Sequence, residues 1–166
     1  MALATTTVYA KKDMAVGVQY SHTVFGLSLK KDVTEKVIVQ GTLGITNSDD
    51  IGVYGLRGIY KLTEDKDWYT YGFGSLSYWK YKTLEISGTF NSAFKDSSSI
   101  GFGLGAGLEY ALSSFSQSKL PLYWSIELGY DKVSIDSLKG GAHGVNLDTS
   151  IDIGGVFIGT GFHYKF

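Results

Sequence analysis

The chain contains no cysteine, a single proline and no apolar run long enough for a membrane-spanning helix. The first absence excludes disulfides, thiolate nucleophiles and zinc sites built on cysteine. The third excludes a transmembrane helix, which needs about 18 consecutive apolar residues. Hydropathy alone would therefore predict a soluble protein. A transmembrane strand, however, needs only about 9–11 residues of alternating character and leaves a much weaker signal.

The charge balance narrows the range of partners. With 15 Lys and Arg against 16 Asp and Glu in 166 residues, the chain lacks the positive excess that binding to a nucleic-acid backbone requires. No linker or composition shift divides it, so we expect one domain over residues 1–166. The first thirteen residues lack the apolar core of a signal peptide, about 7–15 residues long, so we expect a mature form if the protein is exported.

Glycine and aromatic residues are abundant, with 22 Gly, 12 Tyr and 9 Phe. They recur with a period of two, most cleanly in IGFGLGAGLEYAL at 100–112, where large apolar residues alternate with glycine. Such alternation indicates a β-strand whose two faces meet different surroundings. The pattern predicts eight strands, at 15–21, 24–30, 36–44, 51–62, 68–79, 100–112, 120–130 and 156–166.

The composition of the face opposite the apolar residues, the second face of each strand, indicates which face points into the barrel. In VFIGTGFHYKF at the carboxyl end, Val156 and Ile158 share one face, while the glycines and His163 share the other. A soluble barrel would expose a face rich in Lys, Glu, Asn and Thr. Here the second face is mainly glycine with isolated Glu, Gln, Arg and Ser, which suits the narrow interior of a small barrel. We therefore predict an all-β, eight-stranded antiparallel up-and-down transmembrane β-barrel whose apolar face meets lipid.

The connections sort by length in a way that agrees with this fold, because outer-membrane barrels have short periplasmic turns and longer extracellular loops. With both termini in the periplasm, a periplasmic location is predicted for the segment 1–13 and for the turns at 31–35, 63–67 and 113–121. The long stretches, about 80–99 and 131–155, then both become extracellular loops. Alternating runs at 5–10 and 83–90 leave open a different first strand and a hairpin that extends beyond the barrel.

These features resemble the small eight-stranded outer-membrane β-barrels of Gram-negative bacteria, the OmpA-domain, OmpX-type and porin-like proteins. The resemblance covers about residues 14–166 through strand rhythm and glycine use. Its most specific element is the terminal FHYKF, in which Phe162, Tyr164 and Phe166 alternate up to the last residue. In that family such a terminus is the signal read by the barrel-assembly machinery. The resemblance implies a monomer in the bacterial outer membrane, surrounded by the lipid bilayer and lipopolysaccharide.

Polar residues on the glycine-rich face form the candidate site. Arg57, Glu109 and Glu127 are all predicted to point into the lumen, where a charge has to be paired. We expect a polar network that plugs the barrel. Its further members would be Gln19, Gln40 and His163, with Lys30, Lys61 and Lys165 filling in. Two other interpretations of these charges stay open: a gated polar path, and paired carboxylates for acid–base chemistry.

Aromatic residues are predicted at both membrane interfaces, where rings with a polar edge are enriched in barrels of this kind. The periplasmic girdle would contain Trp124, Tyr69, Tyr71, Tyr164 and Phe166. The outer girdle would contain Tyr20, Tyr78, Trp79, Tyr81 and Tyr130. An ordinary aromatic core is the alternative.

No catalytic or cofactor-binding motif is found in the sequence. His22, His143 and His163 begin the triplets HTV, HGV and HYK, so the His-x-Ser pair used by the deacylases among the resembling barrels is absent. Without cysteine or an HExxH motif, a metal site has no support. GFGLGAG has glycine spacing like that of a dinucleotide fingerprint, but no helix follows it. We therefore expect no enzymatic activity, no metal and no cofactor.

The variable chemistry is expected in the loops. SGTFNSAFKDSSS at 87–99 is polar, with Phe90 and Phe94 interspersed, and suits contact with another surface. The leading hypothesis is a structural, adhesin-like role in which extracellular loops bind a host or surface ligand. Three alternatives stay open. They are a narrow pore or channel for small or hydrophobic solutes, opened by Glu109→Ala with Arg57→Ala; a lipid A modifying enzyme; and a soluble barrel whose apolar faces surround a ligand.

Overall fold

The computed structural model describes most of the chain, namely residues 13–21, 24–44, 51–81, 97–114, 120–135, 140–142, 145–147 and 151–166. The expectations for His22, His143, Phe90 and Phe94, and for the alternating runs at 5–10 and 83–90, lie outside these residues. In the described part, no helix is both long and apolar enough to cross a bilayer.

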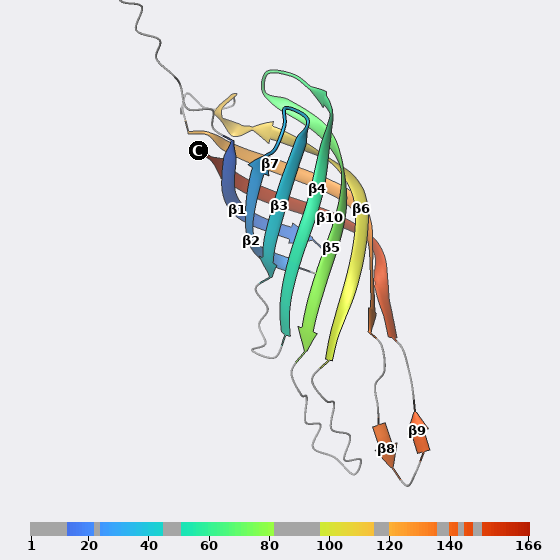
Figure 1. Ribbon diagram of the computed structural model, residues 1–166. Coiled ribbons are helices and arrows are strands. Elements are labelled where there is room, and N and C mark those ends of the chain that lie inside the picture. The colour runs from blue at the N-terminus through green and yellow to red at the C-terminus, as the bar shows by residue number, and fades with distance from the viewer. Residues whose placement is uncertain are drawn as a thin grey trace, which may run out of the picture.

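Eight strands close into one antiparallel barrel in the order β1-β10-β7-β6-β5-β4-β3-β2 (Figure 1). Each strand of the barrel pairs with the next one along the chain, and the last pairs with the first, so the predicted up-and-down topology is confirmed. The barrel strands are β1 Met14–Ser21, β2 Val24–Asp32, β3 Val37–Gly44, β4 Ile51–Glu64, β5 Trp68–Tyr81, β6 Ser97–Ala111, β7 Leu122–Ile135 and β10 Ile151–Lys165. A short turn, η1 Leu112–Ser114, follows β6, and a separate hairpin consists of β8 Gly140–Ala142 and β9 Val145–Leu147.

The strands differ in length more than the sequence pattern predicts. The first three have 8 or 9 residues, whereas β4 to β7 and β10 have 14 or 15. The strand β7 continues to Ile135 and β10 begins at Ile151, inside the stretch that was expected to be a loop. Pairing between backbones does not need an apolar face, so it continues after the alternation of side chains has ended.

The short turns and the strand ends that border the long connections lie at opposite ends of the barrel, as expected. The turns after β2 and β4 lie at the same end as the C-terminus (Figure 1). In the first of these turns, the Val37 backbone N–H donates to the Thr34 hydroxyl at 3.0 Å, and the Val33 N–H donates to the Val37 carbonyl at 2.9 Å. The strand ends that border residues 82–96 and 136–150 lie at the opposite end.

The apolar residues form the outer wall of the barrel. Among the most exposed side chains are Val156 at 73 %, Ile100 at 69 % and Leu104 at 61 %. Every strand contributes to this wall, for example through Val16, Leu27, Leu43, Leu56, Leu76, Leu104, Leu128 and Ile158. The alternative of a soluble barrel with its apolar faces turned inward is therefore wrong. A chain with this much apolar outer wall has a surface suited to lipid rather than water.

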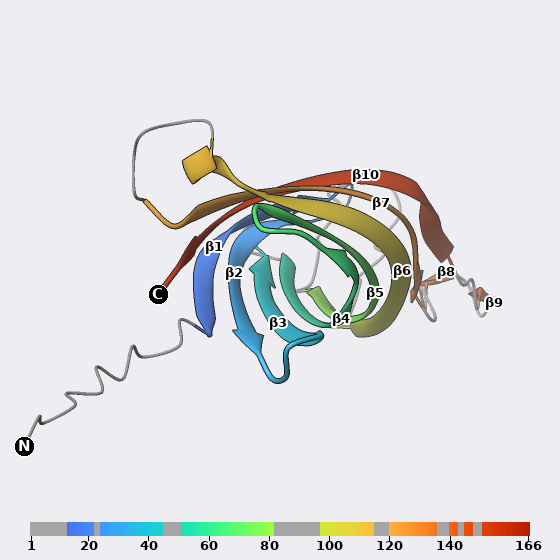
Figure 2. The same cartoon turned by 90° about the horizontal axis from the view of Figure 1, so that it is seen from above.

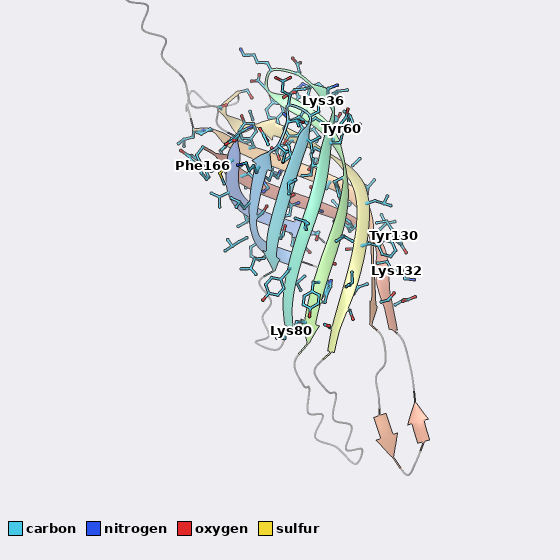
Figure 3. The ribbon with its side chains drawn as sticks, in the orientation of Figure 1. Lys36, Tyr60, Lys80, Tyr130, Lys132 and Phe166 are labelled. Carbon is cyan, nitrogen blue, oxygen red and sulfur yellow. The ribbon has the colours of Figure 1, made fainter. Side chains whose placement is uncertain are left out.

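The height of the wall matches a bilayer. On β10 and the residue that follows it, the apolar outward positions run from Val156 to Phe166, ten residues apart. At about 3.3 Å per residue and a tilt of about 40°, this span rises about 25 Å along the barrel axis, the height of a lipid-facing band. Figure 3 shows Tyr60 and Phe166 at the end that carries the C-terminus and Lys80 toward the other end.

The interior contains an apolar layer that the sequence analysis did not predict. Figure 2 shows the barrel from above. Inside it, Ile38, Ile59, Tyr71, Phe73 and Phe157 are buried against one another. Glycines on β6 make room for two of these rings. A Cβ atom at Gly105 would lie 2.6 Å from the Phe73 ring, and one at Gly107 would lie 2.6 Å from the Tyr71 ring. Glycine on the inner face is thus required by the packing of the neighbouring strand.

A lysine placed on the outer wall tests whether this wall meets lipid. We expect Leu104→Lys to lower the free energy of unfolding in phospholipid vesicles by about 2–4 kcal/mol, because the charge would sit near the middle of the bilayer. Ser98→Lys lies on the same face of the same strand near its outer end and should cost about 0–1 kcal/mol. Urea titrations followed by tryptophan fluorescence measure both, and equal small effects would show that the wall does not face lipid.

Candidate functional site: the interior polar network

The carboxylate of Glu127 on β7 is the centre of the first polar cluster. Arg57 on β4 donates from Nη1 to both oxygens, at 3.1 and 3.0 Å. Gln19 on β1 donates to Oε2 at 3.0 Å, and the Tyr71 hydroxyl on β5 donates to Oε1 at 2.7 Å. The Glu127 side chain is fully buried, so its charge is balanced by these neighbours and not by water. Four strands are therefore joined through one carboxylate.

A second cluster surrounds Glu109 on β6. Lys30 on β2 forms a buried ion pair with Oε2, and the Tyr69 hydroxyl on β5 donates to Oε1 at 2.6 Å. Lys61 lies over the Tyr69 ring, with 5.0 Å between its Nζ and the ring centroid. These contacts place one positive charge beside each buried carboxylate. The interior charges are therefore compensated locally.

The hydroxyl of Ser28 on β2 links further residues to the first cluster. Gln40 on β3 donates from Nε2 to the Ser28 Oγ at 2.6 Å and to the Gln19 Oε1 at 3.3 Å. The His163 Nε2 on β10 lies 3.0 Å from the same Ser28 Oγ. Gln40 and His163 are both almost completely buried. Through this hydroxyl, the network reaches the strand that closes the barrel.

The lumen is filled beyond these clusters as well. The Arg57 guanidinium lies over the Phe73 ring at 4.3 Å, which stacks the first cluster directly on the apolar layer. Toward the C-terminal end, Lys165 pairs with Asp32 at 2.7 Å and Lys61 with Glu64 at 2.9 Å. A cavity of about 60 Å³ is left beside Arg57, lined by inner-face residues that include Gln19, Thr42, Val53, Ser75, Ser77 and Phe157.

The structure places every predicted polar residue on the inner wall. Arg57 and Glu127 come together, whereas Glu109 joins Lys30 and not Arg57. The set that was expected to share one interior is Gln19, Gln40, Arg57, Glu109, Glu127 and His163, and all six are buried. The sequence could indicate the face on which each residue lies, but the choice of partner depends on the stagger between strands.

Three aromatic residues were assigned to the wrong face. Tyr69 and Tyr71 were expected in the periplasmic girdle, but both donate hydrogen bonds to interior carboxylates. Trp79 was expected in the outer girdle, but it shares the inner face with Ser77, to which its indole N–H donates at 3.0 Å. The run WYTYGFGSLSYW has large residues on both faces and glycines at 72 and 74, so period two alone did not reveal its orientation.

The other girdle residues lie on the outer wall. Tyr164 and Phe166 are exposed near the C-terminal end, and Tyr20, Tyr78 and Tyr130 are exposed toward the outer end. Trp124 also belongs to the outer face, where its indole N–H donates to the Thr160 hydroxyl at 2.9 Å. The side chain of Tyr81 lies outside the described residues. Tyr54 joins the outer group, with its ring centroid 6.4 Å from that of Tyr78.

This arrangement is suited to structural sealing. All four oxygens of Glu109 and Glu127 accept hydrogen bonds or ion pairs from the protein. Carboxylates engaged in this way are held in place by their neighbours and cannot turn toward a substrate. Among the described residues, no group of three or more His, Cys, Asp or Glu is placed to hold a metal ion.

Removing the charge of Glu127 tests the first cluster. Glu127→Gln would leave the buried Arg57 without a counter-charge, and we expect it to lower the free energy of unfolding in detergent micelles by about 3–5 kcal/mol. Glu64→Gln makes the same chemical change at a half-exposed ion pair and should cost about 0–1 kcal/mol. Denaturant titrations of both variants measure the difference. Equal costs would mean that the interior pair does not hold the barrel together.

Similarity to known proteins is found at the level of structure and not of sequence. No protein-family model matches the sequence, and no curated protein matches it. Three solved structures similar to the chain are outer-membrane proteins. The N-terminal β-barrel domain of Pseudomonas aeruginosa OprF has 15 % identity and a TM-score of 0.55, covering 93 % of this chain and 96 % of that one.

Outer membrane protein H (OprH) from P. aeruginosa has 21 % identity and a TM-score of 0.51, covering 93 % of this chain and 99 % of that one. Neisserial surface protein A has 17 % identity and a TM-score of 0.46, covering 93 % and 94 %. At such low identity the first two show a shared fold. The resemblance to small outer-membrane barrels is therefore confirmed as a resemblance of fold: the chain forms an eight-stranded antiparallel barrel of the kind found in those outer-membrane proteins.

Proposed function

We propose that the protein is an integral, monomeric barrel of the bacterial outer membrane that is sealed inside and carries surface-contacting segments at its outer end. The observation that supports this most directly is that the apolar face of each strand points outward and the polar face points inward, the reverse of a soluble barrel. The outer wall is apolar on all eight strands, and the buried charges are paired inside. The outer-membrane origin of OprF and OprH supports the same location.

The carboxyl terminus is suited to recognition before the barrel closes. Phe162, Tyr164 and Phe166 are exposed on the outer face near the C-terminal end. In the closed barrel the Phe166 N–H donates to the Met14 carbonyl at 2.8 Å, so the last residue is already paired with β1. We infer that the barrel-assembly machinery binds this segment while its backbone is still unpaired, and that closure releases it.

The position of the two long connections between strands supports the surface role. Residues 82–96 and 136–150 connect strands whose adjoining ends lie opposite the C-terminus, and β8 and β9 form a hairpin within the second of these segments. Loops on a rigid barrel commonly carry binding. A ligand on a host cell or another surface is thus proposed to bind at this end, and the role is structural and interactive, without catalysis or a cofactor.

Orientation in the membrane can be tested cleanly because the chain has no cysteine of its own. In intact Gram-negative cells, we expect a membrane-impermeant maleimide to label Ser98→Cys, near the outer end of β6, but not Glu35→Cys, in the turn after β2. Permeabilised cells should label both. A heat-dependent mobility shift of each variant on a semi-native gel controls for folding. Labelling of Glu35→Cys alone in intact cells would reverse the orientation and remove the surface role.

The pore alternative is decided by conductance in planar bilayers. Because the two ion pairs and the apolar layer fill the lumen, we expect negligible conductance for the wild-type barrel. Arg57→Ala with Glu127→Ala removes the pair that the structure brings together, and Lys61→Ala with Glu64→Ala is the control at the rim. We expect neither to conduct, since Phe73 and Phe157 remain. Discrete openings in the wild type would establish the channel instead.

A further inference from the structure

The ladder that closes the barrel is short and leaves much of β10 without a neighbour. Six residue pairs of the sheet join β1 to β10, from Ala15 opposite Lys165 to Tyr20 opposite Thr160, and Phe166 bonds to Met14 beyond them. On its other side β10 pairs with β7 along its length, from Ile151 to Tyr164. The strand β1 ends at Ser21, and the chain returns as β2 at Val24, opposite Ser21. Among the described residues, the outer half of β10 thus has a strand on one side only.

The register identifies which backbone groups face the vacant side. The Phe166 N–H donates to the Met14 carbonyl at 2.8 Å, whereas the Lys165 N–H donates to the Pro121 carbonyl, on the β7 side, at 2.9 Å. In an antiparallel strand the N–H and C=O of one residue point to the same side, and the side alternates along the strand. Even-numbered residues of β10 therefore point toward the β1 side. Beyond the pairs with β1, these are Asp152, Gly154, Val156 and Ile158, of which Ile158 adjoins the end of β1 and is left out of the edge.

Two neighbouring side chains indicate the surroundings of this edge. The Val156 side chain is 73 % exposed on the apolar wall. Asp152 lies on the same face at the polar rim, where it pairs with Lys132 at 2.8 Å and accepts a hydrogen bond from Ser134 at 2.7 Å. From Val156 to Asp152 the edge is about 13 Å long. It therefore crosses from the level of lipid into the aqueous phase outside the membrane.

We propose that the outer half of β10 is an acceptor edge for an extended segment of another protein, which adds to the barrel in the position that β1 vacates. Within the described residues, the six backbone groups of Asp152, Gly154 and Val156 have no strand beside them, and an acyl chain has neither a donor nor an acceptor. An added strand supplies both at the required spacing. The fitting segment runs outward, antiparallel to β10, with an apolar residue beside Val156 and a polar one beside Asp152.

A second copy of this chain is the less suitable occupant. In one membrane, β10 of a second copy runs toward the periplasm like the first, so two such edges would meet in parallel. An antiparallel partner has to run outward, as β1, β3, β5 and β7 do. In the described part, β3 and β5 are paired on both sides to their last residue, and β7 lacks a neighbour only at Ser134 and Ile135. Since the described strands of a second copy offer no fitting edge, we assign this position to a different protein.

Amide hydrogen exchange of the refolded barrel in detergent tests whether the edge is free. We expect the N–H groups of Asp152 and Gly154 to exchange at least about 100-fold faster than those of Ile153 and Gly155, which face β7. The alternation itself is the diagnostic result. Equal protection along residues 152–156 would mean that the chain covers its own edge, which overturns the proposal. This outcome is independent of the proposed function, which the mobility shift on a gel tests separately.

Binding of a synthetic peptide tests whether the edge of β10 can pair with an added strand. The probe is a synthetic peptide with the sequence of residues 126–135, IELGYDKVSI, because this segment pairs antiparallel with Ile151–Thr160 in the barrel. Val156→Pro removes one donor from the free edge, while Val156→Ala keeps the donor and trims the side chain. We expect Val156→Pro to weaken binding at least about ten-fold and Val156→Ala to change it less than about three-fold.

The remaining outcomes of the peptide experiment are also decisive. Asp152→Pro, with Asp152→Ala as its control, is the second variant if Val156→Pro does not fold, as judged by the heat-dependent mobility shift. No binding to the wild-type barrel, or equal binding to the wild type and the proline variants, overturns the acceptor edge. Binding of the probe in the parallel orientation, read from a spin label attached at one of its ends, would contradict the direction that we assign to the partner.

Discussion

The closure of the sheet between β1 and β10 is the constraint on which the rest of the molecule depends. Strands that cross lipid have no water to satisfy their backbone groups, so every edge at that depth has to be paired. Between β1 and β10, six residue pairs satisfy this from Ala15 and Lys165 as far as Tyr20 and Thr160. Closure with eight strands fixes a narrow barrel, in which the interior is only wide enough for its own side chains. The demand for glycine and the paired charges both follow from this width.

The filling of the lumen shows how a narrow interior accommodates charge. Glu127 and Glu109 each have a cation and a tyrosine hydroxyl as neighbours, and the cations come from strands far away in the sequence. A buried carboxylate lacking these partners would destabilise the fold, whereas a fully bonded one joins strands. The apolar layer around Phe73 and Phe157 packs against one side of the network, where the Arg57 guanidinium lies over the Phe73 ring. Sealing and stability therefore have the same origin.

Because the strands differ in length, one side of the barrel wall is tall and the other is short. The strands β1 to β3 end early, whereas β4 to β7 and β10 continue beyond them toward the outer end (Figure 1). Because β1 ends early, it pairs with only part of β10. The part of β10 that extends beyond β1 forms the edge at the polar rim, where the described residues place a strand on one side only. The connections proposed to contact other surfaces begin from the long side. The position of these features is thus a consequence of how far each hairpin extends, and not of a separate binding motif.

The sequence by itself determined the eight strands, their order and the inversion of the two faces, because alternation of side chains is a local property of an extended chain. It also selected the polar residues that lie inside, from Gln19 to His163. Only the tertiary structure decided that Arg57 pairs with Glu127 and Lys30 with Glu109, since the stagger around a closed barrel brings together residues on strands that are not sequence neighbours. It also turned Tyr69 and Tyr71 inward, because Gly107 of β6 leaves space for the Tyr71 ring and the carboxylates of Glu109 and Glu127 accept hydrogen bonds from the two hydroxyls.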